Sequence, residues 1–363
     1  MLWFRFSRRI RRAFGLFKSS TVSVGHGAGA VLTVAPVQRV NLHTKIKIHG
    51  HCNVVKNAGK PDEQTVADGS NVLRNAGRDA LLLNMVNSVA TNRKAAVLIA
   101  TSTNADAESR TITNAPGIIS TGGLAAREAT TRLGVAATGV CTLTRTFTAT
   151  AAHAAIAKSF LQIRNPAPPA APTSFVNVHE KLFDSTVDLA IGDTLTVTWT
   201  ITVTRQTVGS DPLMVNGTND DCGIRGLLIV LYVGDIHGTY NPVGWQYIGM
   251  SAVVQNILTS DDFLGGEITA GAAGTSTDTD LERALGTATH VTGTNVVTVA
   301  HTFTANAARN AADIPQNIYK FGLFKDDTIA NRTILFLGTD ATPLNLTPGG
   351  SATVTWTITL DQT

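Results

Sequence analysis

Alternation of apolar and hydroxyl side chains is the strongest pattern along this chain. It is clearest in the heptapeptide Thr-Val-Thr-Trp-Thr-Ile-Thr, which occupies residues 196–202 and again residues 353–359. Successive side chains of a strand point to opposite faces, so strict alternation predicts a β-strand with one buried face. Trp199 and Trp356 fall on the apolar side. We therefore expect both tryptophans to lie in a hydrophobic core rather than on a binding surface.

Similar patterns predict most of the remaining elements. Basic and apolar residues alternate after Val40, and Gly50 is expected to divide this stretch, giving a basic hairpin over residues 45–56. Leucines and Met85 at helical spacing predict a helix over residues 71–86, capped by Ser70 or Asn71. Further strands are expected at 95–99, 140–150, 156–164 and 182–203, with a loop-rich segment at 101–140 that holds a short helix near 124–132.

The heptapeptide is part of a longer internal repeat. Residues 145–152 correspond to residues 301–308 at an offset of 156, and the heptapeptides are offset by 157. The Lys158-Ser-Phe-Leu segment corresponds more loosely to Lys320-Phe-Gly-Leu, and Leu98-Ile-Ala to Ile248-Gly-Met. Two copies of this length predict a mainly β fold with two tandem, related antiparallel β-sandwich domains, at 40–205 and 212–363, and one or two short helices.

Composition narrows the class of protein. Only 15% of the residues are charged, against ~25% in a typical globular protein, and the polar remainder is mostly Thr, Asn, Ser and Gly. The formal net charge of +3 is local, because the first 18 residues contribute +6 and leave −3 for the rest. A body that binds nucleic acid is therefore not expected.

Cysteine usage and hydropathy exclude further classes. Cys52, Cys141 and Cys222 are widely spaced and contain no Cys-x-x-Cys pair, so we expect buried thiols rather than disulfides or a zinc site. No apolar run reaches the ~20 residues of a membrane span, and no secretory signal is recognisable.

Residues 1–18 form a basic arm, joined to the body by a connector at 19–39. Apolar residues recur at helical spacing on one side and arginines lie on the other, which predicts an amphipathic helix. Docking into a groove of a partner protein is the favoured interpretation; contact with a membrane surface, with nucleic acid or with the chain's own body are the alternatives. The residues predicted to dock are Trp3, Phe6, Ile10, Phe14 and Phe17 on the apolar side and Arg5, Arg8, Arg9 and Arg12 on the basic side.

Few residues suggest chemistry. His49, His51 and Cys52 form the tightest group of soft metal ligands, but Cys52 would face away from both histidines on a strand, so no metal site is expected. The carboxylates of Asp220, Asp221, Asp278, Asp280 and Glu282 lack the spacing of a calcium loop and are expected to be solvated. Motifs of nucleophilic, nucleotide-binding or metalloprotease sites are absent. We therefore expect no enzyme activity and no cofactor.

The order of segments resembles the small β-sandwich proteins of tailed-phage virions. The resemblance rests on the basic hairpin at 45–56, the helix Asn-Val-Leu-Arg-Asn-Ala-Gly-Arg-Asp-Ala-Leu-Leu-Leu, a short buried strand, the Thr-Phe-Thr-Ala strand and the final Gly-Asp-Thr-Leu-Thr-Val-Thr-Trp-Thr-Ile-Thr. It covers residues 40–203 and, more loosely, 212–360. It implies a structural subunit of the neck, tail or capsid surface, located in the virion and contacting copies of itself and other virion proteins.

Two other classes of function stay open at this point. A cell-surface or secreted adhesin would bind glycans through loops such as 244–249. Trp245 and Tyr247 in this loop lie outside the alternating pattern, which leaves an exposed position open to them. A polysaccharide hydrolase is the weaker alternative, since paired carboxylates cannot be recognised from sequence alone.

Overall fold

The structure is a computed structural model and shows a mainly β fold with two short helices and several sheets. The residues that it describes are 37–86, 95–108, 117–125, 127–133, 139–164, 175–205, 213–215, 223–233, 244–253, 258, 260–261, 263–268, 281–307, 314, 317–327 and 333–362. The predicted arm and most of the connector lie outside these residues.

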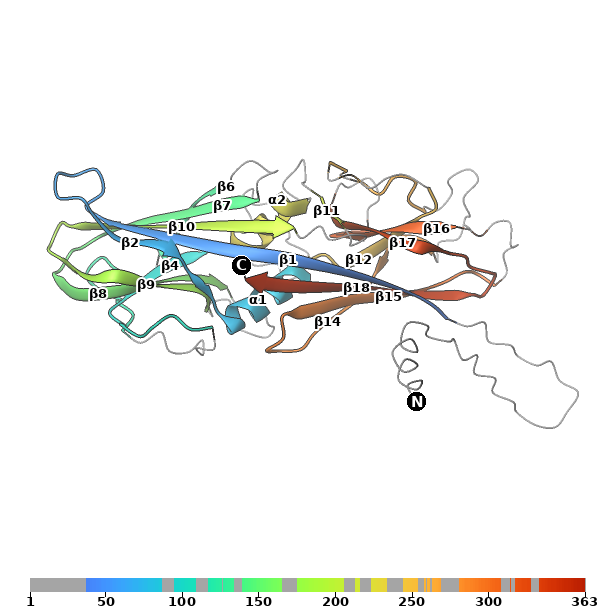
Figure 1. The fold of residues 1–363 in the computed structure, drawn as a ribbon, viewed down its shortest axis with the longest axis horizontal. Coiled ribbons are helices and arrows are strands. Elements are labelled where there is room, and N and C mark those ends of the chain that lie inside the picture. Colours follow the sequence, from blue (N-terminus) through green and yellow to red (C-terminus); the bar gives the residue numbers. More distant parts are fainter. Residues whose placement is uncertain are drawn as a thin grey trace, which may run out of the picture.

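One long strand, β1 (Gln38–Lys56), organises the molecule and runs along most of its length (Figure 1). It lies in the middle of an eight-stranded sheet, between β10 (Thr194–Arg205) and β18 (Ser351–Gln362). β10 pairs antiparallel with its second half and β18 pairs parallel with its first half. The other strands of this sheet are β7 (Val140–Thr148) and β6 (Thr130–Leu133) beyond β10, β15 (Val296–Thr304) and β14 (Thr287–His290) beyond β18, and β2 (Gln64–Ser70) against β1.

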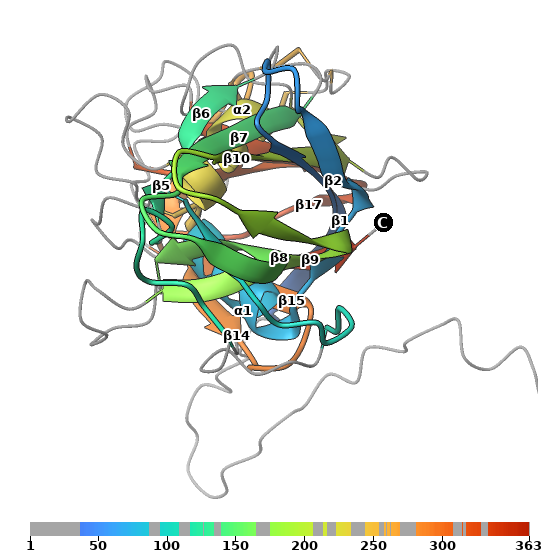
Figure 2. The same ribbon diagram turned by 90° about the vertical axis from the view of Figure 1, so that its left-hand side faces the viewer.

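Two five-stranded sheets complete the β structure, and Figure 2 shows one of them facing the long sheet. Both have the same strand order. The first contains β3 (Val72–Leu73), β9 (Phe175–Leu189), β8 (His153–Arg164), β4 (Ala96–Ala100) and β5 (Arg127–Glu128). The second contains β11 (Leu213–Met214), β17 (Ile334–Leu344), β16 (Ile318–Phe324), β12 (Tyr247–Ser251) and β13 (Ala284–Leu285).

The repeat extends beyond the segments that the sequence aligns. In each half a short strand is followed by a helix and then by a series of strands. The helix of the first half is α1 (Asn75–Val86). The helix of the second half is α2 (Gly223–Leu228), which continues as the π-helix η2 (Ile229–Val233). β7 and β15 have the same pattern of buried and exposed positions, residue for residue. The two halves therefore share their element order and their strand pairing, while β1 and β2 have no counterpart.

The pairing of β1 shows how one strand serves both halves. Trp199 of β10 lies opposite Cys52, and its repeat Trp356 of β18 lies opposite Leu42. Cys52 and Leu42 are equally far along the chain from Lys47. Val54 and Val40 are also equally far from Lys47, and they lie opposite the repeated residues Val197 and Val354. The registers thus describe a local twofold axis that passes through β1 at Lys47 and relates β10 to β18.

The core lies between the long sheet and the two smaller sheets. Trp199 and Trp356 are fully buried, as predicted, and each packs against a ring from the facing sheet. The Trp199 ring lies 6.1 Å from His179 on β9, and the Trp356 ring lies 5.9 Å from Phe336 on β17. Cys52 and Cys141 are buried free thiols, and burial raises the pKa of Cys141 to about 12. Cys222 lies outside the described residues.

Three predictions about local structure are wrong. Gly50 does not break β1, because its missing Cβ makes room for the side chain of Asn71, and Gly50 O accepts a 3.1 Å hydrogen bond from Asn71 N. The first helix is present and ends at Val86 as predicted, but it begins at Asn75 rather than Asn71, since Val72 and Leu73 pair with β9 as β3. The segment near 124–132 contributes strands β5 and β6 rather than a helix, because both find partners in β4 and β7.

The halves also contact each other through their helices. Asp79 of α1 accepts hydrogen bonds from the side chain of His290 (2.9 Å) and from Gly293 N (3.0 Å), next to β14 of the other half. In the other direction, Tyr232 of η2 makes a 2.9 Å hydrogen bond with His179 of β9. Each half thus completes part of the other's packing.

Candidate functional site

The outer side of the long sheet is the most distinctive surface that the structure describes. Alternate residues of β7, β10, β18 and β15 point to this side, and most of them are threonines, so we call it the threonine face. Its members are Thr142, Thr144, Thr146, Thr148, Thr196, Thr198, Thr200, Thr202, Thr204, Thr298, Thr302, Thr304, Thr353, Thr355, Thr357 and Thr359, all exposed or partly exposed.

Hydroxyl pairs across neighbouring strands order this face. Thr146 and Thr196 lie 3.0 Å apart between β7 and β10, and the repeated pair Thr302 and Thr353 lies 2.8 Å apart between β15 and β18. Cross-strand Thr pairs of this type stabilise a sheet by roughly 0.2–1 kcal/mol each. The pairing also fixes the hydroxyl positions, so the face presents a regular array with little side-chain entropy left to lose on binding.

β1 carries a basic stripe along the middle of the threonine face. Its outward residues are Arg39, Asn41, His43, Lys45, Lys47, His49, His51, Asn53 and Val55. Within this stripe, His51 Nε2 lies 3.2 Å from Oδ1 of Asp68 on β2. The prediction that Cys52 faces away from His49 and His51 is confirmed, because both histidines point outward while Cys52 is buried on the opposite side of the sheet. In the described residues no group of His, Cys, Asp and Glu side chains could hold a metal ion.

The edges of the long sheet are the second part of the site. β6 and β14 are its outermost strands within the described residues. An edge strand leaves backbone N–H and C=O groups available for pairing with another chain. The threonine face and its edges can therefore support association with a neighbouring molecule.

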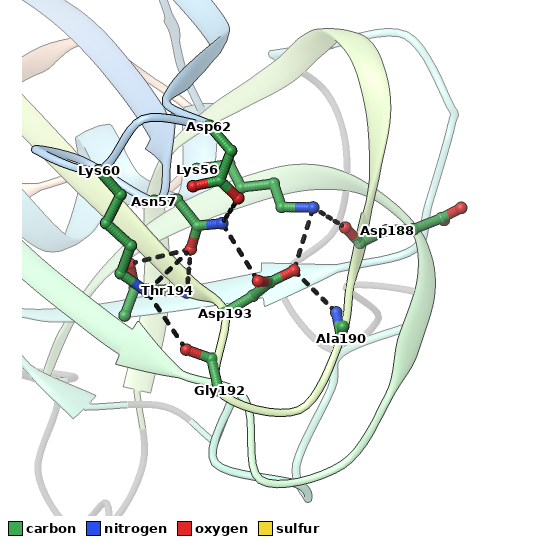
Figure 3. A network of polar contacts seen from close by, with 9 residues as sticks. All are labelled: Lys56, Asn57, Lys60, Asp62, Asp188, Ala190, Gly192, Asp193 and Thr194. Carbon is green, nitrogen blue, oxygen red and sulfur yellow. Dashed lines mark hydrogen bonds and ion pairs between the residues drawn. The ribbon is translucent and has the colours of Figure 1, made fainter.

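A polar network closes one end of the long sheet (Figure 3). Asn57, with a φ of 50°, follows β1 and donates its amide to Asp62 (2.6 Å) and Asp193 (3.1 Å). Lys56 contacts Asp193 at 3.0 Å and the carbonyl of Asp188 at 2.9 Å. These contacts lower the pKa of Asp193 to about 2. The hydrogen bond from Ala190 N has the largest effect, and those from the side chains of Asn57 and Lys56 have smaller ones. These contacts tie the turn after β1 to the β9–β10 turn, which is a structural role.

Two clusters of charged side chains are buried, and nothing in the sequence pattern predicts either. In the first half, Lys158 of β8 lies near Asp106 and Glu180, and Arg74 precedes α1. In the second half, Arg283 forms a two-pronged ion pair with Glu267 at 2.7 and 2.8 Å, with its guanidinium 3.6 Å from the centre of the Phe324 ring. Burial raises the pKa of Glu267 against the opposing effect of Arg283.

The loop expected to bind glycans does not have the predicted exposure. Trp245 is fully buried, and its indole N–H donates a 2.9 Å hydrogen bond to the carbonyl of Thr333. Tyr247 and its neighbours belong to β12 rather than to a loop. Trp245 is therefore not an exposed platform, because its indole N–H finds its partner inside the second half, while Tyr247 is half-buried.

Other predicted sites lie outside the described residues. This applies to all the docking residues of the arm, from Trp3 to Phe17, and to Asp220, Asp221, Asp278 and Asp280. Among the helices that the structure describes, none is long and apolar enough to cross a membrane.

The fold and its surfaces define a mainly β protein with an internal repeat. Comparisons with protein-family models, with curated proteins and with solved structures gave no significant match to this chain. Any function must therefore be argued from the molecule itself.

Proposed function

We propose that the chain is a non-enzymatic structural subunit of a phage virion, a component of the neck, tail or capsid surface. The virion assignment follows the resemblance in segment order described above. In this proposal the subunit assembles with copies of itself and with other virion proteins. The observation that carries it is the threonine face, a broad polar surface whose hydroxyls are held in pairs on both sides of β1.

A hydroxyl array suits burial between subunits. Desolvating a hydroxyl costs far less than desolvating a charge, and a hydroxyl can both donate and accept when a partner surface arrives. Charged residues are depleted at the centres of protein interfaces for the same reason. The basic stripe of β1 adds charges along one line, which would set the orientation of a partner with matching acidic groups.

The proposal includes two related antiparallel sandwich domains in tandem. The shared strand order of the two smaller sheets and the packing of each tryptophan against a ring of the facing sheet support this organisation. Because β1 pairs with strands of both domains, the domains would act as one stiff unit rather than as two domains joined by a flexible linker. Such a unit can present the whole threonine face to a neighbour in a single orientation.

In the same proposal, residues 1–18 are a docking arm. Their aromatic and arginine residues would fold into a helix on a groove of an adjacent virion protein. Removal of residues 1–18 should leave the body folded, as judged by circular dichroism, but unable to join particles. Incorporation of the shortened chain at the normal level would contradict docking by the arm.

A charge placed on the threonine face tests assembly. Thr198 and its repeat Thr355 point outward on β10 and β18, so Glu at both positions should be tolerated by the fold. In an interface the two carboxylates would lose their water, and we expect association to weaken by at least tenfold. Sedimentation of the purified protein and its incorporation into particles are the measurements.

Serine at both positions is the matched control, because it keeps the hydroxyls and should assemble normally. Equal assembly of the Glu and Ser variants would show that the threonine face is not an interface.

A further inference from the structure

The buried cluster around Lys158 has the arrangement needed for a covalent bond. Lys158 lies on β8 with no exposed surface, and its Nζ is 2.9 Å from Oδ1 of Asp106, in the segment that follows β4. Glu180 of β9, also fully buried, places Oε1 3.7 Å from the same Nζ. We propose that Lys158 and Asp106 join in an intramolecular isopeptide bond, with Glu180 as the proton-transferring group.

The contact between the two partners is unusual for an ion pair. Although Nζ and Oδ1 are within hydrogen-bond distance, the angles at these atoms are not those of a hydrogen bond. An ammonium–carboxylate contact without hydrogen-bond geometry repays little of the cost of removing the two groups from water. Conversion to an amide would remove both charges, and this gives the condensation a driving force in a largely buried site.

Surrounding groups hold Asp106 in position for attack. Its second oxygen, Oδ2, accepts a 2.9 Å hydrogen bond from Leu182 N. The next residue, Ala107, donates its N–H to Glu180 Oε1 at 2.7 Å. The segment is thus fastened to β9 through the carboxyl group itself and through the residue that follows it. This supplies the fixed orientation that makes an intramolecular reaction fast.

Most of the site is shielded from water, although the Asp106 side chain keeps 17% of its surface exposed. Phe160 has no exposed surface, and the centre of its ring is 5.8 Å from Lys158 Nζ. Phe160 forms a small buried apolar cluster with Leu98 and Ala100 of the adjacent β4. The buried apolar side chains around Lys158 limit the access of water, which disfavours the reverse hydrolysis, so the bond would persist once formed.

The reaction balances with one water released. A proton passes from the Lys158 ammonium to Asp106 Oδ1, which leaves a free amine and a carboxylic acid. The amine lone pair attacks Cγ of Asp106 and forms the C–N bond, while the N–H of Leu182 stabilises the negative charge on Oδ2. Glu180 accepts a proton from the nitrogen and returns it to Oδ1, the C–Oδ1 bond breaks and water leaves. Oδ2 remains as the amide oxygen and Glu180 is regenerated.

The second half provides an internal contrast. Its buried pair joins Arg283 to Glu267, and a guanidinium stays protonated in proteins and does not attack a carboxyl group. Lys320, the repeat counterpart of Lys158, is buried on β16. The inference therefore assigns one isopeptide bond, in the first half, which would fasten the segment after β4 covalently to β8.

Intact-mass measurement of the purified full chain tests the inference directly. We expect the mass to be one water below the sequence mass. After digestion with a protease that cuts after lysine, Lys158 should be uncut and should link its peptide to the one that contains Asp106. A folded wild-type chain with the full sequence mass would overturn the proposal. Water loss confined to a single linear peptide would overturn it as well.

Substitutions separate the roles of the three residues. Lys158→Met and Asp106→Ala should retain the full mass, and Glu180→Gln should slow or stop the loss of water. Asp106→Asn should form the same amide with release of ammonia in place of water. Lys320→Met, the matched control, should still lose water. Because the wild-type mass is decisive by itself, a variant that does not fold leaves the test intact; loss of water in folded Lys158→Met would contradict the assignment.

Discussion

At the residue scale, the tryptophans show that the surroundings of a side chain, and not its residue type, decide whether it is buried or exposed. Trp199, Trp245 and Trp356 are all fully buried. Only Trp199 and Trp356, in the two copies of the heptapeptide, could be recognised as core residues from the alternation. Trp245 lies outside any alternating stretch, and its hydrogen bond to the carbonyl of Thr333 joins residues far apart in the sequence. Local pattern carries no information about such a partner.

Asp193 gives a prediction about pH. Its pKa falls from 3.8 to about 2 in the folded chain, because the carboxylate accepts the N–H of Ala190 and contacts Asn57 and Lys56. A carboxylate with a lowered folded-state pKa stabilises the fold above its unfolded pKa, and this contribution is lost as the pH falls from 3.8 to about 2. Asp193→Asn should therefore lower the urea midpoint at neutral pH, by an amount that shrinks across this interval.

Asp184→Asn is the comparison for that measurement, because Asp184 is mostly exposed and its ion-pair contact with Lys181 is 3.7 Å. It should change the midpoint little at any pH. A constant difference between Asp193→Asn and wild type over the whole acid range would contradict the assigned role of the Asp193 charge.

At the element scale, β1 shows why a glycine in an alternating stretch need not end a strand. Gly50 faces inward in the middle of β1, where the side chain of Asn71 occupies the space that a Cβ would need. A glycine is favoured both in a tight turn and where another side chain approaches the backbone closely. Only the tertiary structure shows which of the two reasons applies at a given position. The same reason applies to β5 and β6, whose strand conformation depends on pairing with β4 and β7.

Gly50→Ala should destabilise the protein by about 1–3 kcal/mol, because the added methyl group overlaps the Asn71 amide and one of them must move. Chemical denaturation measures the change. In a double-mutant cycle, Asn71→Ala should relieve part of the cost, giving a coupling energy of about 0.5–3 kcal/mol. Additive effects of the two substitutions would show that this contact does not determine the choice of glycine.

At the scale of the whole molecule, β1 links the two halves through opposite edges. β10 takes one edge and β18 the other, and the helices add contacts such as Asp79 with His290. We expect the halves to unfold in one cooperative transition, since neither can lose β1 without exposing an unpaired strand.

Removing β18 tests this expectation. Deletion of residues 351–363 should reduce hydrogen-exchange protection in β9 and β10 of the first half as well as in the second half. Removal of residues 1–18, which belong to no described sheet, should leave protection in both halves unchanged. Full protection of β9 and β10 without β18 would mean that the first half folds independently.

The sequence by itself determined the mainly β character, the internal repeat and the burial of Trp199 and Trp356, because each of these depends on local periodicity or on similarity along the chain. Tertiary structure alone decided that β1 serves both halves, that Trp245 is buried, and that Lys158, Asp106 and Glu180 meet in one cluster. These features depend on which distant segments pair, and strand pairing leaves only a weak trace in a single sequence.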